Sequence, residues 1–129
     1  MLLPIMKIGE AARRAGVSVD TLRFYERRGI LPTPGRRASG YRVYPEAVVE
    51  RVRLVKYMQE LGMRLDEILE VLHMLDEGSA TCTNQRPRFQ AVVKRIDQDL
   101  AQLRATRSRI VKLLRRCEAG KCSLQWTAP

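Results

Sequence analysis

The last third of the chain carries apolar residues at alternating intervals of three and four positions. This spacing puts them on one side of an α-helix and is typical of helices that pair along a seam. The pattern predicts a long helix over residues 86–117 that joins two copies of the chain into a homodimer. Only Arg107 interrupts the series, and Cys117 continues it. The seam consists of Phe89, Val93, Ile96, Leu100, Leu103, Ile110 and Leu114.

Two shorter amphipathic segments open the chain. Residues 7–16 have the composition of a short helix, and Gly16 ends it because glycine readily adopts the left-handed conformation of a helix terminus. Ser18 is suited to cap a second helix, which runs to Arg28 and stops at Gly29. Two short helices joined by a tight turn predict a helix-turn-helix.

The next segment contains helix breakers. Pro32, Pro34, Gly35 and Gly40 exclude a helix. The stretch YRVY at residues 41–44 alternates and is rich in β-forming residues, so we expect a short two-stranded wing with a basic tip.

Two more helices follow the wing. Pro45 is suited to the first turn of a helix that ends at Gly62, and residues 64–75 place leucine and isoleucine on one face of the next. The stretch at residues 76–87 is polar and turn-rich, which indicates a hinge before the long helix. We therefore expect a mainly α protein.

Charge and composition narrow the function. The 129 residues carry a formal net charge of +10, which favours a polyanionic partner such as nucleic acid over a merely solvated basic surface. No stretch approaches the roughly 20 apolar residues of a membrane span, and the N-terminus does not have the pattern of a secretory signal. Three cysteines, an odd number, favour reduced thiols in the cytoplasm over a disulfide framework.

The second predicted helix carries polar residues suited to DNA. Ser18, Thr21, Arg23 and Tyr25 lie on it, and short polar side chains there reach phosphates or base edges. Its N-terminal amides also favour phosphate. Together with the basic wing, this pattern predicts a DNA-binding surface.

The cysteines predict a second kind of site. A helix over residues 86–117 is roughly 45–50 Å long at about 1.5 Å per residue, so Cys82 and Cys117 of one chain cannot share a ligand. In an antiparallel dimer, Cys82 of one chain would meet Cys117 and Cys122 of the other, which gives two thiolate clusters per dimer. A soft metal ion is the simplest ligand for such clusters. Incidental or structural cysteines are the alternative.

The stretches IGEAARRAGVSVDTLRFYERRGIL and GYRVYPEAVVERVRLVKYMQELGMRLDEI closely resemble the MerR family of transcription regulators. The resemblance covers residues 6–118, and its most specific elements are TLRFYE and GYRVY. It implies a winged helix-turn-helix, a second helical pair and an antiparallel dimerisation helix. It also implies that operator DNA is contacted by Arg23 and Tyr25 from the recognition helix and by Arg42 and Tyr44 from the wing. One departure is Arg64, where many relatives have a capping serine.

The resemblance also guides the choice of effector. Family members that sense divalent soft metals have a cysteine just before the dimerisation helix, where this chain has Cys82. The spacing of Cys82 and Cys117 is similar to that of the mercury sensors, although the loop between Cys117 and Cys122 is shorter than theirs. The expected effector is Hg(II), followed by Cd(II), Pb(II) or Zn(II).

The family implies how such a protein works. A homodimer occupies a palindromic promoter, and the metal-bound form distorts the DNA so that RNA polymerase transcribes metal-resistance genes. The expected parts are a DNA-binding domain at residues 6–76, a hinge with Cys82 at 77–85, a dimerisation helix at 86–117 and a metal-binding loop and tail at 118–129.

Other functions fit the sequence less well. A redox-responsive relative would carry four closely spaced cysteines in the terminal loop, and a drug-binding relative would need a further C-terminal domain. An architectural DNA-binding protein without an effector would not need its cysteines, and an RNA-binding or partner-docking helical protein would show no preference for palindromic duplex. An enzyme is not expected, because no glycine-rich phosphate loop or nucleophile–base arrangement is present in the sequence.

Overall fold

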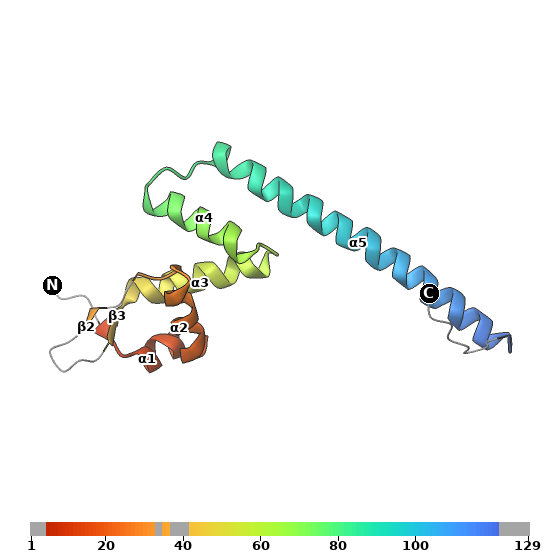
Figure 1. Ribbon diagram of the computed structural model, residues 1–129, viewed down its shortest axis with the longest axis horizontal. Helices are drawn as coiled ribbons and strands as arrows, with labels where there is room; N and C mark the ends of the chain where they lie inside the picture. The colour runs from red at the N-terminus through yellow and green to blue at the C-terminus, as the bar shows by residue number, and fades with distance from the viewer. Residues whose placement is uncertain (1–4, 33–34, 37–41, 122–129) are drawn as a thin grey trace. The chain divides into compact units, whose positions relative to one another are not determined.

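The computed structural model describes residues 5–32, 35–36 and 42–121, and the chain divides into two compact units, Met1–Arg88 and Phe89–Pro129 (Figure 1). Cys122 and the tip of the wing lie outside the described residues. Within the described residues, no helix is long and apolar enough to cross a membrane.

The first unit opens with the predicted helix-turn-helix. Helix α1 spans Ile8–Ala15 and helix α2 spans Val19–Arg27. Gly16 between them has a φ of 72°, a conformation that glycine adopts without strain. The Ser18 hydroxyl accepts a hydrogen bond from the Thr21 amide at 3.1 Å, so the predicted N-cap of α2 is confirmed.

Three short strands form a small antiparallel sheet beside the helix-turn-helix. Strands β2 (Gly35–Arg36) and β3 (Arg42–Pro45) form the predicted wing. The sequence did not predict the third strand, β1 (Ile5–Met6), which pairs with the other edge of β3 and gives the strand order β1-β3-β2. A strand of two residues is too short to show any periodicity, so only its pairing reveals it.

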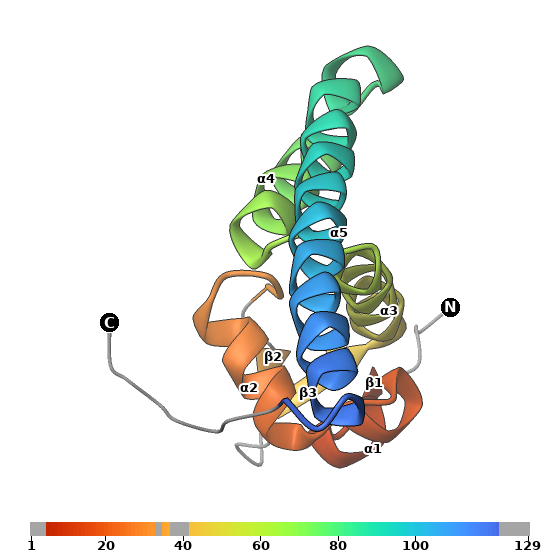
Figure 2. The ribbon, with the colours of Figure 1, turned by 90° about the vertical axis from the view of Figure 1, so that its right-hand side faces the viewer.

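Two helices complete the core of the first unit. Helix α3 spans Glu46–Glu60 with Pro45 as its N-cap, and helix α4 spans Leu65–Asp76. Helix α3 packs against α1, α4 and β3, and a short turn joins it to α4 (Figures 1 and 2). The largest fully buried side chains come from α2 and the segment after it, β3, α3 and α4: Tyr44, Leu22, Ile30, Ile68, Leu72, Val49, Val52 and Val55.

Helix α5 spans Cys82–Glu118 and begins four residues before the start that the hydrophobic pattern suggests. The reason lies in its N-terminus. Asn84 Oδ1 accepts a hydrogen bond from the Thr81 amide at 2.9 Å, and Thr81 Oγ1 accepts one from the Asn84 amide at 3.1 Å. These reciprocal bonds satisfy helix-terminal amides in the manner of a capping box. Cys82 is therefore the first residue of the helix.

The second unit consists of the rest of α5 and the residues after it. Its seam residues are exposed within the single chain, from 42% for Ile96 to 65% for Leu103. A row of half-exposed large apolar side chains is unusual for a surface that faces only water.

Candidate functional site

The N-terminal half of the recognition helix α2 presents its polar side chains to solvent. Ser18 is exposed, and its hydroxyl lies 2.8 Å from that of Thr21, which is half-buried. Arg23 is exposed. The guanidinium of Arg23 is therefore accessible to a phosphate or a base edge, whereas the Ser18 hydroxyl also serves the helix cap.

Tyr25 has a different environment. Its side chain is buried, with 4% exposed, and its hydroxyl donates a hydrogen bond to Gln59 Oε1 of α3 at 3.1 Å. Burial raises the pKa of the Tyr25 phenol, because an ionised phenolate would lose its hydration. This hydroxyl joins the recognition helix to α3.

Tyr44 is more deeply buried, with 1% exposed. Its hydroxyl donates a hydrogen bond to Glu26 Oε1 of α2. Burial, and then the hydrogen bond and charge of Glu26, raise the pKa of Tyr44 to about 12, although Arg42 partly offsets them. The tyrosine of the wing is thus held neutral against the recognition helix.

Glu26 also binds the arginine of the wing. Arg42 Nη1 donates to Glu26 Oε2 at 2.9 Å, and the Glu26 side chain is only 10% exposed while that of Arg42 is 45% exposed. The sequence did not predict Glu26 as a site residue, because a carboxylate is not a DNA-binding group. The available signal was its place as the acidic residue in the basic TLRFYER stretch at the end of the recognition helix.

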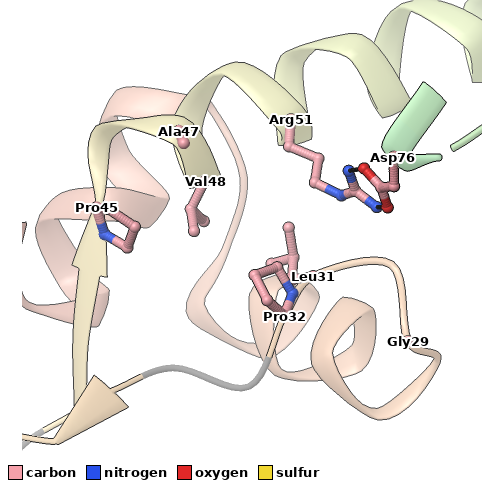
Figure 3. Close-up of a pocket in the computed structure, with 8 residues that line it drawn as sticks. All are labelled: Gly29, Leu31, Pro32, Pro45, Ala47, Val48, Arg51 and Asp76. Carbon is pink, nitrogen blue, oxygen red and sulfur yellow. Dashed lines mark hydrogen bonds and ion pairs between the residues drawn. The ribbon is translucent and has the colours of Figure 1, made fainter. Parts of the chain in front are cut away.

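Arg51 connects α3 to two further segments of the first unit. Its Nε donates to the backbone carbonyl of Ile30 at 2.5 Å, and Nη1 and Nη2 donate to the two carboxylate oxygens of Asp76 at 2.7 and 2.8 Å (Figure 3). The Arg51 hydrogen bonds hold the pKa of Asp76 below its usual range. Arg51 thereby joins the segment after α2 to the end of α4.

An open cavity of about 450 Å³ lies beside this ion pair (Figure 3). Apart from Arg51 and Asp76, its lining is apolar or glycine, and the two charged groups already bind each other. The cavity offers no unpaired charge that would select a ligand. Its lining comprises Gly29, Leu31, Pro32, Pro45, Ala47, Val48, Arg51 and Asp76.

The cysteines lie at the two ends of α5. Cys82 is exposed in its first turn, and Cys117 is exposed in its last turn. One chain therefore keeps them roughly 50 Å apart at about 1.5 Å per helical residue. Among the described residues, no three His, Cys, Asp or Glu side chains gather closely enough to hold a metal ion. The proposed ligand Cys122 is outside the described residues.

The start of α5 is fastened to α4 close to Cys82. Gln85 is buried and its Nε2 lies 3.1 Å from Met74 Sδ, while Arg88 forms an ion pair with Glu70. A displacement of Cys82 would therefore be transmitted to α4 by Gln85 and Arg88, which lie three and six positions after Cys82 on α5.

Comparison with known proteins identifies the architecture. Residues 6–75 match the family described as "MerR HTH family regulatory protein", and residues 49–113 match the family described as "MerR, DNA binding". The chain belongs to the MerR family of DNA-binding transcription regulators. The expected winged helix-turn-helix and long C-terminal helix are confirmed, and its relatives are regulators rather than enzymes.

Three MerR-family proteins are similar to this chain over most of its length. The mercuric resistance operon regulatory protein of Bacillus cereus is 35% identical over 115 residues, which cover 89% of this chain and 87% of that protein. The lead(II) complex of PbrR691 from Ralstonia metallidurans CH34 superposes with a TM-score of 0.79 at 29% identity, covering 95% of this chain and 91% of that one. HiNmlR, a regulator lacking the sensor domain and bound to promoter DNA, gives a TM-score of 0.60 at 27% identity, covering 90% and 85%.

Proposed function

We propose that this MerR-family protein is a metal-responsive activator. A homodimer binds a palindromic promoter and activates metal-resistance genes when a divalent soft metal binds its cysteine thiolates. Hg(II) is the first choice, followed by Cd(II), Pb(II) or Zn(II). The similarity to a mercuric resistance regulator and to a lead(II)-binding regulator supports this class of effector.

The observation that carries the proposal is the placement of two exposed cysteines at opposite ends of one exposed apolar seam. Pairing two such helices antiparallel buries both seams and puts Cys82 of one chain beside Cys117 of the other. Cys122, five residues after Cys117, completes a three-thiolate site. Three thiolates suit soft divalent ions, which accept low coordination numbers.

The proposed DNA interface consists of the recognition helix and the wing. Arg23 and Arg42 are exposed and able to reach phosphates or base edges. Ser18 and Thr21 add short polar groups at the start of α2. The hydroxyls of Tyr25 and Tyr44 already have partners in the protein, and positioning of α2 and β3 is the main contribution that we propose for them. These six residues are Ser18, Thr21, Arg23, Tyr25, Arg42 and Tyr44.

Activation requires the two kinds of site to be coupled. Closing the thiolate sites fixes the ends of both α5 helices, and the contacts of Gln85 and Arg88 with α4 carry that constraint into the first unit. Bending and untwisting of the promoter costs several kcal/mol. The metal must therefore favour the distorting conformation by a similar difference in binding free energy, after which RNA polymerase uses the promoter.

Mixed dimers test whether the metal site is shared between chains. Two chains with different affinity tags, one Cys82→Ser and the other Cys117→Ser, are co-expressed and the doubly tagged dimer is titrated with Hg(II) under thiol competition. We expect one ion per mixed dimer, two for the wild type and none for either homodimeric variant. Two weakened sites in the mixed dimer, or none, would show that each site draws its ligands from one chain.

A further inference from the structure

Among the described residues, Glu26 is the only acidic side chain that bonds to both Tyr44 and Arg42 of the wing. It uses both carboxylate oxygens, one for each partner. The two partners are separated by one residue on β3, whereas Glu26 belongs to α2. A single carboxylate therefore ties the two elements of the proposed DNA interface together.

The described part of the wing strand packs mainly against elements other than α2. Strand β3 packs against α1 and α3, and its neighbours in the sheet are β1 and β2. Both hydrogen bonds of Glu26 join α2 to β3, so they contribute to the orientation of Arg42 relative to the exposed Arg23 of α2. A hydrogen bond to a carboxylate is stronger than one between neutral groups.

We propose that Glu26 is a positioning residue that fixes the wing relative to the recognition helix and thereby sets the preference for operator sequence over other DNA. The proposal rests on the proposed function, in which Arg23 and Arg42 contact DNA. Base readout requires side chains to be held in register with the groove, whereas contact with phosphates tolerates a looser arrangement.

Removing Glu26 has opposite effects on operator affinity depending on whether its positioning role or its negative charge dominates. A carboxylate beside DNA repels phosphates, so its removal alone would strengthen binding to every sequence. If Glu26 positions the wing, its removal weakens binding to the operator and leaves binding to other sequences unchanged or stronger. The difference between two duplexes therefore separates positioning from charge.

The experiment uses two DNA duplexes of equal length. One is selected from a random library by the wild-type dimer, and the other is an unselected random duplex. We expect Glu26→Ala to lower affinity for the selected duplex roughly 5- to 20-fold, the lower part of the roughly 5- to 150-fold loss from removing one base-reading contact, without lowering affinity for the random one. Glu26→Gln keeps an acceptor for Tyr44 and should rescue part of the loss. Should Glu26→Ala not fold, the Gln variant alone carries the test.

Asp20→Asn is the matched control, because Asp20 is an exposed carboxylate in the first turn of the same helix. It should raise affinity for both duplexes by similar factors. A parallel change of both affinities in Glu26→Ala and Glu26→Gln, in either direction, would overturn the positioning role.

Two further measurements isolate the cause. In Glu26→Gln, the ionisation of Tyr44 should move down from a pKa of about 12, because the carboxylate charge beside the phenol is gone. An unchanged titration would show that Glu26 does not hold Tyr44 in solution. If Arg23→Ala and Arg42→Ala both leave the affinity for each duplex unchanged, the proposed DNA interface fails, which is distinct from a failure of the positioning role alone.

Discussion

The pKa of the buried Tyr44 hydroxyl reflects the packing around it. The phenol belongs to the wing strand β3, is 1% exposed, and donates to the carboxylate of Glu26. A phenolate at this place would lose water and meet a negative charge, so the folded protein holds the proton more tightly than the unfolded chain does.

The first prediction is that Tyr44 ionises late. Tyr44 should titrate near pH 12 and give a late step in ultraviolet absorbance. Its contribution to the free energy of unfolding is complete below pH 10 and is lost between pH 10 and 12, since only the unfolded chain releases the proton in that window. Tyr44→Phe should remove the late step. A wild-type titration with no step above pH 11 would contradict this packing.

A second residue-scale prediction concerns Arg51. Removing its guanidinium in Arg51→Ala leaves the Ile30 carbonyl without its donor and unpairs Asp76, and we expect the free energy of unfolding to fall by about 1–2 kcal/mol after allowance for solvent screening. Because the pKa of Asp76 is lowered in the fold, the part due to this pair is present above the ordinary aspartate pKa and is lost as pH falls through the lowered value.

Urea unfolding at neutral pH and in acid measures both effects. Glu50→Ala is the control, since Glu50 pairs with Arg53 on the exposed surface of α3 and its loss should change stability by less than about 0.5 kcal/mol. Equal stability of the Arg51 and Glu50 variants would mean that the Arg51 bonds contribute nothing measurable.

At the scale of elements, helices with local start and stop signals were predictable from sequence. Gly16 and Ser18 mark the turn of the helix-turn-helix, and Gly62 marks the end of α3. What local signals could not show is pairing over distance. The hydroxyls of Tyr25 and Tyr44 bond to Gln59 and Glu26, which are 34 and 18 residues away in sequence, so the burial of both tyrosines could not be predicted from local pattern.

The start of α5 illustrates the same limit. The apolar rhythm begins at Phe89, and nothing apolar precedes it to extend the pattern, yet the Thr81–Asn84 bonds begin the helix at Cys82. The positions of Cys82 and Cys117 on one helix agree with the spacing argument. Their use as metal ligands, and the contacts of the six proposed DNA-binding residues, stay predictions.

The third prediction tests the seam of α5. A charge at Leu100 or Leu103, as Leu100→Lys or Leu103→Lys, should yield monomers, because an ammonium buried in a helix pair has no counter-charge and loses its hydration. Sedimentation at micromolar concentration measures this. Gln98→Lys makes the same substitution on the opposite side of the helix and should stay dimeric. A wild-type protein that sediments as a monomer would contradict the pairing of two α5 helices through this seam.

For the whole molecule, the fourth prediction separates sensing from DNA binding. Cys82→Ser should abolish induction of a promoter by Hg(II) while leaving DNA affinity within about twofold, because Cys82 is exposed and serine suits the first position of a helix. A reporter assay and DNA titration give the two readouts. Retained induction would exclude Cys82 as a ligand.

Because of the exposed seam of the second unit, folding of α5 also depends on protein concentration. Within one chain, the residues from 96 to 118 are exposed apart from the half-buried Val111, and helices without packing are only marginally stable in water. If α5 pairs as proposed, its helicity and the melting temperature rise with protein concentration, and subunits at low copy number lose the ordered helix together with the metal site. The amount of protein in the cell would then help determine how much metal is needed for a response.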